Sequence, residues 1–303
     1  MCNFPDLNRF LLKPDLSGKA GVEHVEAWLE YRAGKLMYDG KKVTDPDSSD
    51  TARCFYKIMW EDFLKNTGFR IHPKLVCHDE KPKVKYPNED PKKYVQGDWM
   101  CSVWTTLKRG LELTYEKNHG GNLWKQEPYM SSLYRKCVTK RTYAEILNHF
   151  DKFSEVFEDT GVQTFIRLAY TYANLIIVPD GFNAARNLPT KDYWDETLKL
   201  YFNNQKALQC KTKKTKKEDE IISYNGGKKF HELVKASRAN GSDSLFLDEW
   251  LDKDKDDKSR PLPDKELTTL DEWRALMQEM TERIKERRNK MDARINELMK
   301  QQH

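Results

Sequence analysis

A stripe of apolar side chains near the end of the chain constrains the fold most. Thr269 and Glu272 have the spacing of a capping box, which predicts that a helix begins there. The stripe repeats every three or four residues and comprises Trp273, Met277, Met280, Ile284, Met291, Ile295 and Leu298. About 30 residues at about 1.5 Å each predict a rod about 45 Å long. The stripe must be buried, either against its own chain, which we favour, or against a partner helix as in a coiled coil.

Shorter repeats of the same period predict further helices in the first 205 residues. One begins at the N-cap residue Asp50 and stops at Gly68, and the next ends at Gly120. A third is expected behind the capping-box pair Thr142 and Glu145. The expected helices span 22–38, 50–68, 100–120, 142–157, 162–173 and 194–201.

Two segments do not have helical periodicity. Prolines recur among charged residues from Ile71 to Gln96, which predicts a long irregular loop. Leu175 to Val178 is a short β-branched run that predicts an extended exit from a helix. The predicted fold class is therefore mainly α, a multi-helix globular bundle with long irregular loops and an extended amphipathic C-terminal helix.

Changes in composition divide the chain into three parts. A helical core domain is expected over 1–205, because the apolar repeats end there. A basic segment with a small helical subdomain follows over 206–251. A charged linker and the long C-terminal helix make up 252–303.

The positive charge is mild overall but concentrated in one place. A net charge of +5 from 53 basic and 48 acidic residues does not by itself imply a polyanion partner. Five lysines nevertheless fall within seven residues, at Lys211, Lys213, Lys214, Lys216 and Lys217. Such a run can neutralise phosphates and is a candidate nucleic-acid-binding segment. A solvated loop is the alternative, and we favour it.

The cysteines and the hydropathy predict a cytoplasmic protein. The six cysteines are scattered without a C-x-x-C pair, so we expect reduced thiols. The N-terminus lacks the basic-then-apolar layout of a signal peptide, and no apolar stretch approaches the roughly 20 residues that cross a bilayer. No membrane association is expected.

Polar residues gather around a proline-glycine turn between Thr171 and Asp195. Asn174, Asn183 and Arg186 form a polar cluster there. As a catalytic site, Asp98, Asp192 or Asp195 would serve as metal ligand or general base, and Arg186 would bind a phosphate. The alternative, which we favour, is structural: turn-forming polar residues and an ordinary ion pair.

No metal site or cofactor site is predicted. Cys77-His78-Asp79-Glu80 has ligand residue types, but adjacent residues cannot surround one tetrahedral ion. The Asp252, Asp254 and Asp256 pattern lacks the glycine and the last glutamate of an EF-hand. The phosphate-binding glycine loop, G-x-S-x-G and H-E-x-x-H motifs do not occur.

Two stretches, GDWMCS from Gly97 and TYANLIIVPDGFNAARNLPTKDYWD from Thr171, carry a family resemblance. Over about residues 94–203 the chain resembles an uncharacterised family of bacterial and phage-borne proteins with G-D-x-M-N-S, V-P-x-x-F-N-x-x-R and D-Y-W-D motifs. Cys101 stands where that family has Asn, and Tyr172-Ala173 where it has Ile-Gly. The resemblance implies one ordered central domain and a bacterial or mobile-element origin, and it implies no reaction.

Three hypotheses for the function remain. The one we favour is an interaction protein in phage–host conflict, or phage defence, that engages a protein or ribonucleoprotein partner through the lysine run and the terminal helix. The second is a metal-dependent nuclease-like enzyme that uses the carboxylates above. The third is a structural homo-oligomer through the C-terminal helix. The sequence favours binding over catalysis.

Overall fold

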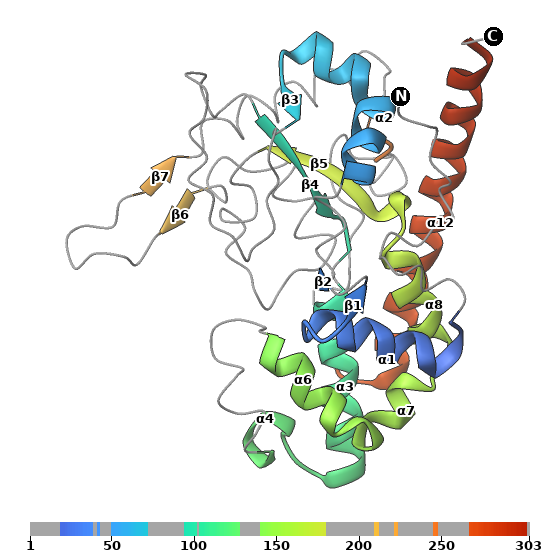
Figure 1. Cartoon of the computed structure of the whole chain (residues 1–303). Coiled ribbons are helices and arrows are strands. Elements are labelled where there is room, and N and C mark those ends of the chain that lie inside the picture. The colour runs from blue at the N-terminus through green and yellow to red at the C-terminus, as the bar shows by residue number, and fades with distance from the viewer. Residues whose placement is uncertain are drawn as a thin grey trace.

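The computed structural model describes residues 19–38, 41–42, 50–71, 94–101, 103–127, 140–179, 209–211, 221–223, 245–247 and 267–301. The predicted fold class is confirmed, because this part of the chain is mainly helical and ends in a long helix (Figure 1). The helices are α1 (Gly21–Arg32), α2 (Asp50–Thr67), α3 (Val103–His119), α4 (Leu123–Gln126), α6 (Lys140–Asn148), α7 (Ser154–Phe157), α8 (Thr160–Ala169) and α12 (Leu270–Gln301), with 3₁₀ turns η4 (Phe150–Phe153) and η5 (Tyr172–Asn174). Within these residues, no helix combines the length and the apolar character needed to cross a bilayer.

A small sheet lies among the helices and was not expected. Its strands are β3 (Arg70–Ile71), β4 (Tyr94–Trp99) and β5 (Leu175–Pro179), in the order β3-β4-β5. β3 is parallel to β4, and β4 is antiparallel to β5. The prediction of an irregular loop is therefore wrong for Ile71 and for Tyr94 to Gln96. The extended segment expected at Leu175 to Val178 is confirmed as β5.

Two further pairs of short strands complete the described sheets. β1 (Met37–Tyr38) pairs with β2 (Lys41–Lys42), and β6 (Gln209–Lys211) pairs with β7 (Ile221–Ser223). Both pairs are antiparallel. Figure 1 shows β6 and β7 well to one side of the helices, on the opposite side of the molecule from α12.

Several helix ends follow the signals in the sequence. α2 stops at Thr67, and Gly68 takes the left-handed conformation with φ +71° that ends a helix readily. At the start of α12, the Glu272 main-chain N–H donates to Thr269 Oγ1 at 3.2 Å. The Thr269 N–H donates to Glu272 Oε2 at 3.3 Å in return. This reciprocal pair is the predicted capping box.

The helix predicted over 142–157 is divided in the structure. α6 begins at Lys140 and ends at Asn148, and η4 and α7 follow as separate turns. Thr142 is therefore inside the first turn of α6 and is not its N-cap. The next helix, α8, is capped by Asp159, whose Oδ1 accepts from the Gly161 N–H at 2.9 Å. Gly161 thus belongs to α8, which begins at Thr160, two residues before the expected start at 162.

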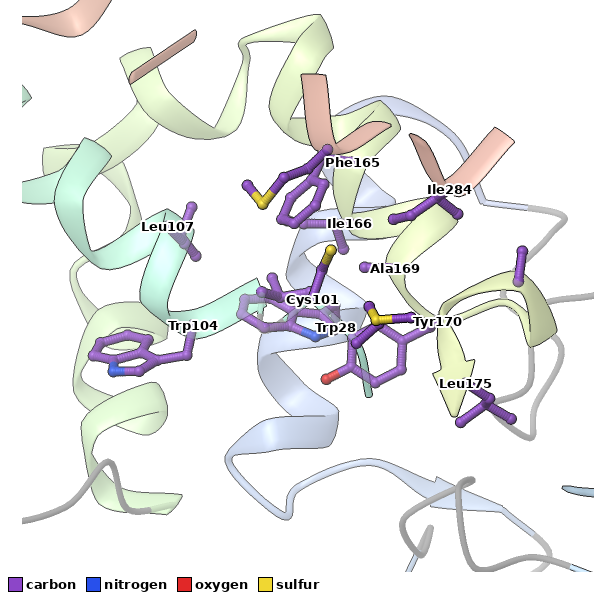
Figure 2. Close-up of a cluster of buried hydrophobic side chains, with 14 of the residues drawn as sticks. Trp28, Cys101, Trp104, Leu107, Phe165, Ile166, Ala169, Tyr170, Leu175 and Ile284 are labelled. Atoms are coloured by element: carbon purple, nitrogen blue, oxygen red, sulfur yellow. The ribbon is translucent and has the colours of Figure 1, made fainter. Parts of the chain in front are cut away.

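The C-terminal helix packs into the core of its own chain. Six of the seven stripe residues, all except Leu298, are buried. α12 packs mainly against α8, α3 and η5. Figure 2 shows Ile284 of α12 beside Phe165, Ile166 and Ala169 of α8. Of the two alternatives for the stripe, the structure therefore shows packing within the chain.

Polar contacts fix α12 along its length. The Trp273 indole Nε1–H donates to the carbonyl oxygen of Thr106 in α3 at 2.7 Å. The Arg274 guanidinium lies 2.8 Å from Asp159 Oδ2, so the residue that caps α8 also anchors the first turn of α12. Together with the buried stripe, these contacts make α12 a central element of the described core.

The cysteine prediction is only partly met. Cys54 on α2 is disulfide-bonded, whereas Cys101 is a free thiol with 1% of its surface exposed. The expectation of reduced thiols is therefore wrong for Cys54.

Candidate functional site

Asn174 belongs to the predicted polar cluster, and the structure shows what its side chain holds. It is fully buried at the end of η5. Its Oδ1 accepts from the Cys101 main-chain N–H at 2.8 Å. Its Nδ2 donates to the carbonyl oxygens of Cys101 at 3.0 Å and Ala169 at 2.8 Å. Both amide N–H bonds are thereby used, so Asn174 clamps the turn between β4 and α3 to the end of α8.

The main chain continues this clamp through the sheet. The Met100 N–H donates to the carbonyl oxygen of Asn174 at 2.8 Å. Across the antiparallel pair, Gly97 lies opposite Ile177 and Asp98 lies opposite Ile176. Residues of the two stretches 97–101 and 171–179 are therefore neighbours in space.

Asp98 is the predicted catalytic carboxylate whose position is described. It lies in β4, with 5% of its surface exposed. Its Oδ1 accepts from the main-chain N–H of Trp99 at 2.8 Å. A carboxylate held in this way at the junction of strand and helix fits a structural role in the turn.

The remaining residues of the predicted site lie outside the described part of the chain. These are the cluster residues Asn183 and Arg186, the carboxylates Asp192 and Asp195, and the four lysines Lys213, Lys214, Lys216 and Lys217. Lys211 is the last residue of β6. The convergence of Asp98 with the other two carboxylates, which a nuclease would need, stays a prediction.

Arg287 is a buried arginine with an important structural role that the sequence did not predict. It is fully buried on α12, where the apolar repeat gave no reason to expect a charge inside. Its Nη1 donates to the carbonyl oxygens of Ala173 at 2.6 Å and Leu175 at 2.7 Å. Its Nε and Nη2 donate to those of Phe246 at 3.1 Å and Leu245 at 3.2 Å. The five N–H bonds of a guanidinium suit this task, because they can bind several carbonyl groups at once.

The contacts of Arg287 place it next to the Asn174 clamp. Two of its four acceptors, the carbonyl oxygens of Ala173 and Leu175, flank Asn174 in the sequence. The other two, those of Leu245 and Phe246, belong to the segment 245–247. One side chain of α12 thus ties together η5, β5 and a remote segment. The Arg287 position supports the same junction that Asn174 holds from within.

A second polar network, also missed, joins α3 to α4 and η4. Glu112 accepts from Lys108 Nζ at 2.9 Å and from the Trp124 indole N–H at 2.5 Å. Fifteen residues along the chain, Glu127 Oε1 accepts from the Tyr115 hydroxyl and from Lys152 Nζ, each at 2.9 Å. The spacing of Lys108, Glu112 and Tyr115 on one face of α3 is the only signal that the sequence offers.

The α3–α4 network satisfies its charges from within. Both carboxylates are mostly buried, with 14% and 12% of their side chains exposed, and each has a cationic partner. Buried polar groups that are fully paired stabilise one arrangement of the chain. The network therefore fits the attachment of α4 to α3, and we assign it no chemistry.

Charge pairing shifts one acid at the edge of this region. Glu155 of α7 accepts from Lys117 Nζ at 2.8 Å and from Asn118 Nδ2 at 3.2 Å, both in the last turn of α3. The hydrogen bond from Lys117, followed by that from Asn118, lowers the pKa of Glu155 below its ordinary value. The carboxylate is thus held ionised.

The described part of the chain shows no group of three or more His, Cys, Asp or Glu residues placed to bind a metal ion. Comparison with known proteins adds no relative, because no family model, curated protein or solved structure matches the chain.

Proposed function

We propose that this chain is a binding protein of bacterial or phage origin that engages a protein or ribonucleoprotein partner through its lysine run. Bacterial or phage origin, and a role in phage–host conflict, rest on the resemblance of residues 94–203 to phage-borne proteins. The described clamp around Asn174 supports this choice over an enzyme, because the polar groups in it are used to hold the main chain.

The pairing of β6 with β7 is the observation that carries the proposal. Lys211 lies opposite Ile221, so the two strands are the arms of one antiparallel hairpin. Residues 212–220, which include the other four lysines, connect these arms. β6, which ends at Lys211, lies with β7 to one side of the helices (Figure 1).

The composition of this hairpin favours contact with a phosphate backbone. Five lysines precede the acidic residues Glu218, Asp219 and Glu220, and no aromatic residue occurs between Gln209 and Ser223. Aromatic side chains are the usual platforms on which bases stack. We therefore propose that the hairpin binds nucleic acid without sequence preference, through counterion release.

The test compares two variants that lose the same charge. In one, Lys211, Lys213, Lys214, Lys216 and Lys217 are changed to Gln. In the control, five exposed lysines from elsewhere are changed to Gln, namely Lys19, Lys57, Lys65, Lys125 and Lys300. Binding of a labelled single-stranded RNA, and of DNA of the same sequence, is measured by fluorescence anisotropy over a range of KCl concentrations.

The variant without the five lysines of the run, here called the run variant, should lose salt-dependent binding. The control should keep it. Five lost phosphate contacts should reduce the slope of log K against log salt by about 3 to 4 for a single strand. Equal binding by both variants would overturn the nucleic-acid proposal. Shortening of the probe in the presence of Mg²⁺ would instead favour the metal-dependent nuclease alternative.

A protein partner is tested with the same pair of variants. The tagged full-length chain and both variants are used to capture proteins from infected and uninfected bacterial cells. A specific partner should be retained by the control and lost by the run variant. If both variants retain it equally, the lysine run is not the contact and the proposal fails.

The proposal places the protein in the cytoplasm. Disulfides such as the one at Cys54 are rare in the cytoplasm and common in oxidising compartments, so the location needs a direct test. Fractionation of cells that express the tagged full-length chain distinguishes the two locations. Recovery outside the cytoplasm would contradict this part of the proposal.

A further inference from the structure

We draw no further inference here: the strongest candidate, the pair of buried indole N–H groups that Trp28 of α1 and Trp99 of β4 present beside the Tyr170 ring, meets no acceptor among the described residues, and nothing in that part of the chain shows what would bind there.

Discussion

Arg287 shows how a single charged side chain can hold a helix in a core. Burial of a guanidinium costs free energy, and replacement of buried charges by apolar residues is sometimes neutral. Here the outcome depends on the acceptors, because four carbonyl groups lose their donors when the guanidinium is removed. Each carbonyl left unsatisfied costs about 1 to 3 kcal/mol. Replacement of Arg287 by an apolar residue should therefore lower the free energy of unfolding.

Arg287→Met keeps most of the length of the side chain and removes its donors. We expect the free energy of unfolding to fall by at least about 2 kcal/mol, since three buried carbonyl groups and one partly buried carbonyl group lose a donor. Urea denaturation followed by circular dichroism measures the change. Arg288→Met on the next, partly exposed position is the matched control. If both variants lose the same small amount, Arg287 does not hold the junction.

Gly110 is required by a neighbour on another helix. A Cβ atom at this position would lie 2.2 Å from Trp273 Cζ2 and 2.5 Å from Cε2 of the same indole. Real Cβ atoms do not approach other atoms this closely, so one of the two helices would have to shift. The absence of a side chain in α3 thus allows α12 to pack closely.

Gly110→Ala should destabilise the protein although alanine favours helix. Overpacking costs about 1 to 3 kcal/mol, and the gain in helix propensity returns at most about 1 kcal/mol. Thermal unfolding measures the net effect. Because both residues share one contact, Gly110→Ala combined with Trp273→Leu should cost less than the sum of the single changes. Strict additivity would show that the indole does not obstruct position 110.

The two cysteines whose side chains are described, Cys54 and Cys101, should react differently. In the native protein a maleimide reagent should label neither, since Cys54 is disulfide-bonded and Cys101 is buried. After denaturation without reductant Cys101 should be labelled, and Cys54 only after reduction. Peptide mass spectrometry identifies the labelled sites. Labelling of Cys54 in the denatured, unreduced chain would show that its thiol is free.

Elements whose signals are local were predicted well. The start of α12 at its capping box and the stop of α2 before Gly68 depend on residues within four positions of the helix end. The division of the helix expected over 142–157 was not predicted. Its apolar residues continue at helical spacing through Phe150 and Phe153, yet the chain turns there as 3₁₀ and packs differently. Periodicity reports which residues are buried, and it reports less well where the helix axis changes direction.

The ion pair between Lys117 of α3 and Glu155 of α7 makes the contact between these helices depend on pH. The pKa of Glu155 is lowered in the folded protein, so its ion pair with Lys117 stabilises the fold above the unfolded pKa of about 4.3. This stability is lost as the pH falls through the lower, folded pKa. Both side chains are substantially exposed, at 38% and 58%, so the contribution stays below about 1 kcal/mol.

Lys117→Gln removes the largest cause of the Glu155 shift. We expect the pKa of Glu155, measured by carbon NMR of its carboxyl group, to rise toward the ordinary value. The difference in stability between wild type and variant should be present at pH 7 and vanish at pH 2. An unchanged pKa would show that Lys117 does not hold the carboxylate.

At the scale of the whole molecule, the helical class follows from the sequence and the sheet does not. β4 pairs with β5 across about 80 positions of sequence, and its residues Gln96, Gly97 and Asp98 carry no apolar alternation. A segment that is a strand because of its pairing with a distant strand cannot be identified from its own composition. The position of Asp98 opposite Ile176 was for this reason beyond sequence reasoning.

The sequence predicted which polar residues to consider as a candidate site, and the fold shows the structural roles of those that are described. Asn174 was selected because it lies among polar residues around a proline-glycine turn, and in the structure its side chain is fully buried at the end of η5. Its role could not be predicted, because its partners Cys101 and Ala169 come from different elements. Arg287 was missed because a charge inside an apolar stripe is explained only by the carbonyl groups that it meets. The lysine run was found because charge density is a property of composition alone.

The sequence by itself determined that this chain forms helices, that its last segment is a long amphipathic rod, and that five lysines gather in one stretch. These follow from residues a few positions apart, which meet within one turn of helix whatever the rest of the chain does. Only the tertiary structure decided that the rod packs in its own core, that Asn174 and Arg287 hold one junction, and that Lys211 of β6 lies opposite Ile221 of β7. Those outcomes depend on contacts between segments far apart in the sequence, because such contacts form only when the whole chain folds.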